Sequence, residues 1–170
     1  PWGADEERAR SARLAAALKD AGYHVAGFPR TGAGLMAELI AGETNDLSRA
    51  GERAADVVLP LAAYRRFFES LPQEAQAAVT ERWGTPEDDA FFGGGGFRLA
   101  MHRFGNVAVG IQPSRGYDID PKASCHDPAL VPPHRYLAFY AWLREEFGAD
   151  AVVHLGKHGN LEWLPGKALG

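Results

Sequence analysis

The sequence has only one cysteine, Cys125, among its 170 residues. A single thiol excludes an internal disulfide and any zinc or iron–sulfur site built from several cysteines. Long apolar runs are also absent: no stretch approaches the roughly 18 consecutive residues of a membrane span, and no charged segment precedes an apolar one as in a signal peptide. We therefore expect a soluble, cytoplasmic protein, although a fragment of a longer chain would have lost any N-terminal signal.

The sequence also lacks a cluster of positively charged residues. Lysines and arginines number 18 against 22 aspartates and glutamates, the formal net charge at pH 7 is −4, and the longest basic run is Arg65 with Arg66. Nucleic-acid binding requires a basic patch or stripe, so we exclude that class of partner. With 46% hydrophobic and 24% charged residues, the composition is that of an ordinary globular domain with a sizeable core.

Hydrophobic patterns in the first half of the chain alternate between helix and strand periods. They predict, in order, a helix over residues 5–20, a short strand over 23–28, and helices over 35–41, 60–70 and 72–83. A glycine ends the first helix, and a proline stands at or near the first turn of each of the last two. Residues 42–56 are polar and are expected to form a surface connection.

The second half begins with residues 88–96, DDAFFGGGG, which predict a flexible loop. Two alternating apolar runs around Gly105 and Asn106 then predict a hairpin over residues 97–112. Residues 113–133 contain five prolines and predict a long loop, which inside a compact domain is usually functional. An aromatic-rich helix is predicted over 136–147.

A short, β-branched run at residues 151–154 predicts a buried strand after that helix. The alternation of helices and strands predicts an α/β fold, a mixed sheet with flanking helices. We divide the chain into residues 1–86, an α/β and helical segment, and residues 87–170, which hold the hairpin, the loop, a helix and the last strand.

Residues 154–167, HLGKHGNLEWLPGK, carry the densest group of titratable side chains in the chain. His154, His158 and Glu162 recur every four residues, and the glycines between them favour a loop that can turn all three inward. Because ligands in α/β proteins bind at the carboxyl ends of strands, we expect these three side chains to share one cavity. The alternative is a purely structural role, in which His154 caps a strand and Glu162 pairs with a lysine.

The segment HLGKHGNLEWLPGK resembles the signature of the cobaltochelatase large-subunit family, CobN, and is similar to the matching stretch of magnesium chelatase large subunits. Residues 110–143, GIQPSRGYDIDPKASCHDPALVPPHRYLAFYAWL, also resemble that family. Residues 51–72, GERAADVVLPLAAYRRFFESLP, resemble it more loosely. Large subunits of this family are many times longer than this chain, so the resemblance implies that the chain is a fragment of a multidomain subunit.

The resemblance also implies a function. It implies the tetrapyrrole-binding catalytic subunit of an ATP-dependent cobaltochelatase, a ligase that forms metal–nitrogen bonds and inserts Co²⁺ into hydrogenobyrinic acid a,c-diamide in cobalamin biosynthesis. AAA+ partner subunits would hydrolyse ATP with Mg²⁺, and the fragment alone is expected to be inactive. The alternatives are magnesium insertion into protoporphyrin IX and a non-catalytic tetrapyrrole-binding or partner-docking module.

Metal insertion requires a base for the two pyrrole protons and labile ligands for a partly desolvated cation. Imidazole and carboxylate groups suit both tasks. We therefore assign His154, His158 and Glu162 as candidate catalytic residues and candidate ligands of the substrate metal. Trp163 provides an apolar wall for the macrocycle, and Lys157 is a further candidate for substrate binding.

The loop before the aromatic helix supplies other candidates for substrate binding. The guanidinium fork of Arg115 can bind a peripheral carboxylate of a corrinoid, or it can form an ion pair with a nearby aspartate. Gln112 ends a predicted strand and is expected to face the same cavity as the signature, because strands 107–112 and 151–154 would be neighbours. His126, followed by an aspartate, is a candidate oriented base, and His134 is as consistent with a helix start as with a ligand.

Three other motifs fail on a required residue. Leu155 stands where a zincin has its catalytic glutamate. Residues 159–167 resemble a phosphate-binding loop, but six residues separate the glycines and Ala168 replaces the Mg²⁺-binding hydroxyl, so this chain should not hydrolyse ATP by itself. The pattern G-x-G-x-x-A at residues 32–37 lies too far after its predicted strand for a dinucleotide site and favours a turn into a helix.

Overall fold

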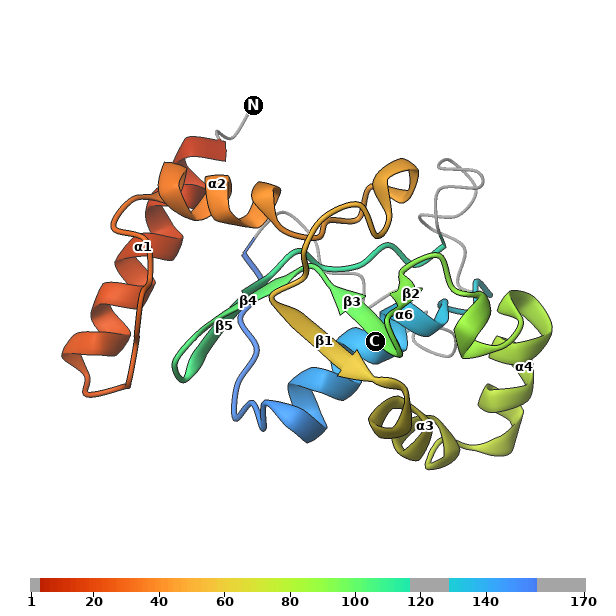
Figure 1. Cartoon of the computed structure of the whole chain (residues 1–170). Coiled ribbons are helices and arrows are strands. Elements are labelled where there is room, and N and C mark those ends of the chain that lie inside the picture. The colour runs from red at the N-terminus through yellow and green to blue at the C-terminus, as the bar shows by residue number, and fades with distance from the viewer. Residues whose placement is uncertain (1–3, 117–128, 156–170) are drawn as a thin grey trace.

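The computed structural model describes residues 4–116 and 129–155 and combines helices with two small antiparallel sheets (Figure 1). The helices are α1 (Ala4–Asp20), α2 (Gly32–Ala41), α3 (Leu61–Glu69), α4 (Gln73–Trp83) and α6 (His134–Ala141), which continues as a π-helical turn, Trp142–Glu146. The strands are β1 (Val57–Pro60), β2 (Phe92–Gly93), β3 (Gly96–Leu99), β4 (Met101–Phe104) and β5 (Val107–Gly110). The α/β class and the five predicted helices are confirmed.

The first sheet has the strand order β1-β3-β2, and β4 and β5 form the second. Val57 pairs with Leu99 and Pro60 with Gly96, so β1 and β3 are matched along their full length. Every strand pair in the described part of the chain is antiparallel. The sheet joins β1 to β3 across the division we predicted after residue 86, and the domain limits themselves stay a prediction.

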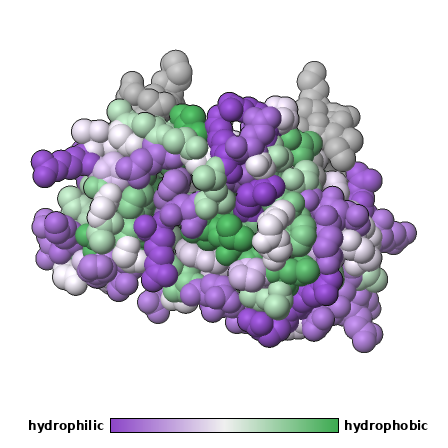
Figure 2. All heavy atoms as spheres, viewed as in Figure 1, coloured by the Kyte–Doolittle hydropathy of each residue, from purple (hydrophilic) through white to green (hydrophobic). Residues whose placement is uncertain are grey.

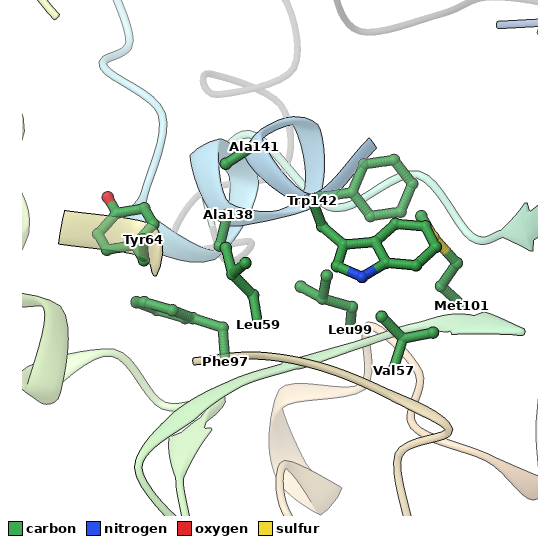
Figure 3. Close-up of a cluster of buried hydrophobic side chains, with 10 residues drawn as sticks. Val57, Leu59, Tyr64, Phe97, Leu99, Met101, Ala138, Ala141 and Trp142 are labelled. Atoms are coloured by element: carbon green, nitrogen blue, oxygen red, sulfur yellow. The ribbon is translucent and has the colours of Figure 1, made fainter. Parts of the chain in front are cut away.

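The main core lies between this sheet and α6. Figure 3 shows Ala138 and Trp142 of the helix above apolar side chains of β1 and β3, and Ala141 belongs to the same buried cluster. The aromatic rings of Tyr64 on α3 and Phe97 on β3 pack at 4.6 Å between centroids, and both side chains are fully buried. Since full burial of one large apolar side chain stabilises by roughly 1.5–3 kcal/mol, these contacts fix α3 and α6 on one face of the sheet.

A second, smaller cluster attaches the N-terminal helices. Leu35 and Leu39 of α2 pack against Phe104 at the end of β4, and α2 crosses and contacts α1 (Figure 1). The predicted strand over residues 23–28 is reduced to a single bridge between Val25 and Gly105. Gly105 is required there because its φ is +72° and a Cβ would lie 2.6 Å from the carbonyl oxygen of His24.

The prediction of a flexible loop at residues 88–96 was wrong. Phe91 is fully buried, and Phe92 and Gly93 form β2, which pairs with β3. Gly94 and Gly95 have φ values of +62° and +84° and connect the two strands as a two-residue turn. Positive φ at both central residues is what a tight hairpin turn needs, so the glycines here specify structure rather than disorder.

The buried strand predicted at residues 151–154 was also wrong. Residues 151–155 adopt no strand and pair with no strand of the described chain. Val152 and Val153 are 53% and 63% exposed. A β-branched run becomes a strand only where a neighbouring backbone offers hydrogen bonds, and none of the described strands does so here.

The visible surface is mixed in character. Figure 2 shows hydrophilic residues over most of this face, with apolar residues interspersed near its centre. Val58 of β1, whose neighbours Val57 and Leu59 point into the core, is 44% exposed. In the described part of the chain, no helix has the length and apolar character that crossing a membrane would require.

Candidate functional site

Three of the predicted site residues, Gln112, Arg115 and His154, lie in the described part of the chain. The others are outside the described residues: His126, Lys157, His158, Glu162 and Trp163. The predicted convergence of His154, His158 and Glu162 therefore stays a prediction. Among the described residues, no group of three metal-binding side chains is assembled.

Gln112 lies directly beyond β5 and is held at both its side chain and its backbone. Its amide nitrogen Nε2 donates to the hydroxyl of Tyr140 on α6 at 2.7 Å. Its carbonyl oxygen accepts from Nδ2 of Asn45 at 2.7 Å. The end of the hairpin is thus tied both to the aromatic helix and to the segment that follows α2.

Arg115 is buried, at 5% exposure, close to the same helix. Its Nη2 donates to the carbonyl oxygen of Leu130 at 3.4 Å, a contact that links the described residues on either side of residues 117–128. The Tyr136 ring lies 5.1 Å from the Tyr140 ring. Burial raises the pKa of Tyr136, the neighbouring Tyr140 raises it further, and the Arg115 charge opposes them. The Arg115 guanidinium and the protonated phenol of Tyr136 therefore belong to one buried polar group.

The route by which we expected His154 to reach this group is not formed in the described chain. His154 is exposed, and the strand that was expected to carry it beside residues 107–112 is absent. The shared sheet by which we placed Gln112, Arg115 and His154 in one cavity is therefore contradicted. Gln112 and Arg115 are brought together by α6, a relation that the sequence did not reveal.

Two charged residues near this group were missed by sequence analysis. Glu43 is 3% exposed, and its carboxylate forms an ion pair with Arg98 at 3.5 Å. Arg135 is 2% exposed, and its guanidinium lies 3.5 Å from the centre of the Phe91 ring. Charged side chains are normally exposed, so the polar composition of residues 42–56 predicted a surface connection. Only the fold supplies the partners that allow Glu43 to be buried.

His134 is a structural residue rather than a ligand. Its Nδ1 lies 2.6 Å from the hydroxyl of Tyr64, and its Nε2 lies 3.0 Å from the carbonyl oxygen of Gly84. Because a carbonyl can only accept, Nε2 carries the proton and Nδ1 accepts from Tyr64. Burial raises the pKa of Tyr64, which stays protonated as this donor. The imidazole therefore connects α3, the end of α4 and the start of α6.

Burial lowers the pKa of His134, although the Gly84 carbonyl and nearby carboxylates act in the opposite direction. Folding thus disfavours the imidazolium, so the unfolded chain takes up the proton first as the pH falls. We expect the stability from this residue to be complete above its ordinary pKa of about 6.5 and to decline below it. Thermal unfolding at pH 7.5, 6.5 and 5.5 measures this loss of stability. The loss between pH 7.5 and 5.5 should be smaller in the His134→Gln variant.

Tyr64→Phe tests the same contact at constant pH. It leaves Nδ1 of a buried imidazole without a donor, so we expect a loss of about 1–3 kcal/mol in unfolding free energy at pH 7.5. Tyr23→Phe is the matched control because Tyr23 is 57% exposed, and it should have little effect. Equal stability of the two variants would contradict the assigned hydrogen bond.

A shallow hollow of about 410 Å³ lies elsewhere, at the edge of the first sheet. It is lined by Asp56, Val57, Val58, Arg103, Gly105 and Trp142. None of the predicted site residues contributes to it. Arg103 and Asp56 already interact through the Arg103 backbone N–H, which donates to the carboxylate at 3.1 Å.

The polar side chains of the described residues can bind a substrate, but they do not form a complete set of groups for proton transfer. The buried guanidinium of Arg115 and the amide and phenol groups around it suit carboxylate or carboxamide substituents. Bases and labile metal ligands would have to come from the histidines and glutamate of residues 154–162, of which His154 alone is described.

Comparisons with known proteins match most of the chain to one family. A family model described as CobN/Magnesium Chelatase matches residues 9–170. The chain is 53% identical over 161 residues to the aerobic cobaltochelatase subunit CobN of a Sinorhizobium species, covering 95% of this chain and 12% of that relative. It is 42% identical over 94 residues to a magnesium-chelatase subunit of Cereibacter sphaeroides, covering 55% of this chain and 8% of that relative.

A solved structure has the same fold. The catalytic subunit of cobaltochelatase from Mycobacterium tuberculosis superposes with a TM-score of 0.74 at 38% identity, covering 98% of this chain and 14% of that one. The chain therefore corresponds to a small part of each relative, and spans 12% of the length of the Sinorhizobium protein.

Proposed function

Because this chain belongs to the CobN/magnesium chelatase family, we propose that it is part of the tetrapyrrole-binding subunit of a cobaltochelatase. The observation that carries the proposal is the identity to a cobaltochelatase subunit, which is higher and extends over more of the chain than the identity to a magnesium-chelatase subunit. The reaction is insertion of Co²⁺ into a corrinoid, hydrogenobyrinic acid a,c-diamide, during cobalamin biosynthesis. Separate AAA+ subunits supply the energy from ATP and Mg²⁺.

We assign the chemistry of insertion to the signature. His154, His158 and Glu162 accept the pyrrole protons and pass on the cobalt ion, which is a substrate rather than a resident cofactor. Neutral imidazoles and one carboxylate give a site that releases its cation readily, as transfer to the macrocycle requires. Lys157 and Trp163 contact the substrate beside them.

We assign substrate binding to the loop that follows the hairpin. Arg115 binds a peripheral carboxylate of the corrinoid through its guanidinium fork, and we assign His126, which lies outside the described residues, to substrate binding with it. Gln112, whose side chain donates to Tyr140, anchors the start of this loop on α6. The burial of Arg115 supports the assignment, because a carboxylate bound there would be shielded from water.

The test is an insertion assay with the full-length subunit and its ATPase partners. Co²⁺ with the corrinoid and Mg²⁺ with protoporphyrin IX are supplied in parallel, and the change in macrocycle absorbance is followed. We expect ATP-dependent insertion of Co²⁺ alone. Insertion of Mg²⁺ into protoporphyrin IX would establish the magnesium activity instead, and tetrapyrrole binding without insertion of either metal would leave a holding role.

A further inference from the structure

The segment over residues 43–45 is fixed from both sides by buried charged groups. On one side, the Glu43 carboxylate accepts from the backbone N–H of Thr44 at 3.1 Å and from that of Gly51 at 3.2 Å. On the other side, Nη2 of Arg135 donates to the carbonyl oxygen of Thr44 at 2.8 Å. A loop held at consecutive peptide groups has little freedom to move.

Arg135 is itself immobilised. Its backbone N–H donates to Oδ2 of Asp89 at 2.9 Å, while its guanidinium lies over the Phe91 ring. Asp89 also accepts from the backbone N–H of Phe91 at 3.0 Å. The position of Thr44 is thus set by α6 and by the residues that lead into β2, both part of the main core.

Asn45 extends from this fixed segment to the proposed substrate loop. Its Nδ2 donates to the carbonyl oxygen of Gln112 at 2.7 Å. Because that carbonyl can only accept, the amide nitrogen must face it, and Oδ1 points away. Oδ1 is buried and has no hydrogen-bond partner among the described residues.

The hydrogen bond and the buried acceptor have opposite effects on stability. Forming the bond to Gln112 stabilises the fold, while burying Oδ1 without a partner costs a comparable amount. An alanine at this position would remove the unpaired Oδ1 but would also leave the Gln112 carbonyl without this donor. Asn45 thus fixes the point at which the chain leaves the hairpin.

We propose that Asn45 is a positioning residue for substrate binding, setting through Gln112 the place of residues 113–116 and hence of Arg115. Sequence analysis did not select it, because residues 42–56 had no recognisable motif. The inference rests on the proposed function for its substrate, a tetrapyrrole with peripheral carboxylates. The displacement of the loop itself can be measured without that substrate.

The experiment uses the full-length subunit with its ATPase partners and the variants Asn45→Ala and Asn45→Asp. An aspartate has the same shape but cannot donate to the carbonyl. We expect each variant to raise the KM for the corrinoid about tenfold with kcat within about twofold of wild type. Amide hydrogen exchange at Ser114, Arg115 and Gly116 should accelerate, also without substrate.

Asp46→Ala is the matched control from the adjacent position. The Asp46 carboxylate accepts from the backbone N–H of Ser48 and does not contact Gln112, so KM and exchange should stay at wild-type values. Unchanged exchange in both Asn45 variants, or faster exchange with an unchanged KM, would overturn the proposal. Faster exchange in a subunit that binds no corrinoid would instead overturn the proposed function and leave the positioning of residues 113–116 supported.

Discussion

Replacing Gly96 by alanine is expected to lower the free energy of unfolding by about 2–4 kcal/mol. A Cβ at this position would lie 2.5 Å from the carbonyl oxygen of Leu59 and 2.9 Å from Cγ1 of Val58. The first of these contacts is with backbone, which cannot rotate away. β1 and β3 would have to separate where Pro60 pairs with Gly96, and this would loosen Leu59 and Phe97 in the core. Chemical denaturation of wild type and variant measures the loss.

Gly94→Asn is the control for this experiment because it changes a neighbouring glycine in the same hairpin. Gly94 has a φ of +62°, and a Cβ there would meet nothing within 4 Å. Asparagine tolerates that conformation and is favoured in such turns, so the change should stay within about 0.5 kcal/mol. If Gly96→Ala proved as mild as Gly94→Asn, the close approach of β1 and β3 would not be a constraint on the sequence.

The helices were predictable because their signals are local. Pro60 and Pro72 are the N-cap residues of α3 and α4, and Gly84, with a φ of +78°, ends α4. The Gly-Asn turn likewise predicted the β4-β5 hairpin, since Phe104 pairs with Val107 around it. Each of these features depends on the backbone preferences of one or two residues.

Features that depend on distant partners were not predictable in this way. β1 has four residues and runs directly into α3, so its pattern was too short to separate from the helix. The four glycines at residues 93–96 indicated flexibility, yet Gly96 is required by the approach of β1, which lies more than thirty positions earlier in the chain. Conversely, the valines of residues 151–155 have strand character without a strand partner in the described chain.

In the candidate site, too, local features were predictable and features that depend on distant partners were not. Arg115 and Gln112 were selected for their chemistry, and the structure places both beside α6 through Tyr136 and Tyr140. Glu43 and Arg135 were missed because burial of a charge is decided by tertiary partners, here Arg98 for the first and Phe91 with Thr44 for the second. The titratable groups of residues 154–162 were identified from sequence alone, and their mutual arrangement stays a prediction.

Glu162→Gln is expected to reduce the rate of cobalt insertion by the full-length subunit at least about 100-fold at saturating corrinoid, the usual range for loss of a general base. Glutamine keeps the size of the side chain but cannot accept a pyrrole proton, and it is a weaker ligand for the incoming cation. Because the macrocycle is held mainly by other groups in this proposal, the Kd for the corrinoid should change by less than about threefold. Rates come from the absorbance change, and Kd comes from fluorescence titration without ATP.

Glu145→Gln separates this effect from a general loss of one negative charge. Glu145 is exposed, forms an ion pair with the adjacent Arg144 at 3.2 Å and is not among the proposed substrate contacts, so the insertion rate of this variant should equal that of wild type. A Glu162→Gln subunit that inserts cobalt at more than a tenth of the wild-type rate would remove Glu162 from the role of base. Weakened corrinoid binding with a normal rate at saturation would assign it to holding the substrate, because a group that acts equally on the bound substrate and the transition state changes KM and leaves kcat intact.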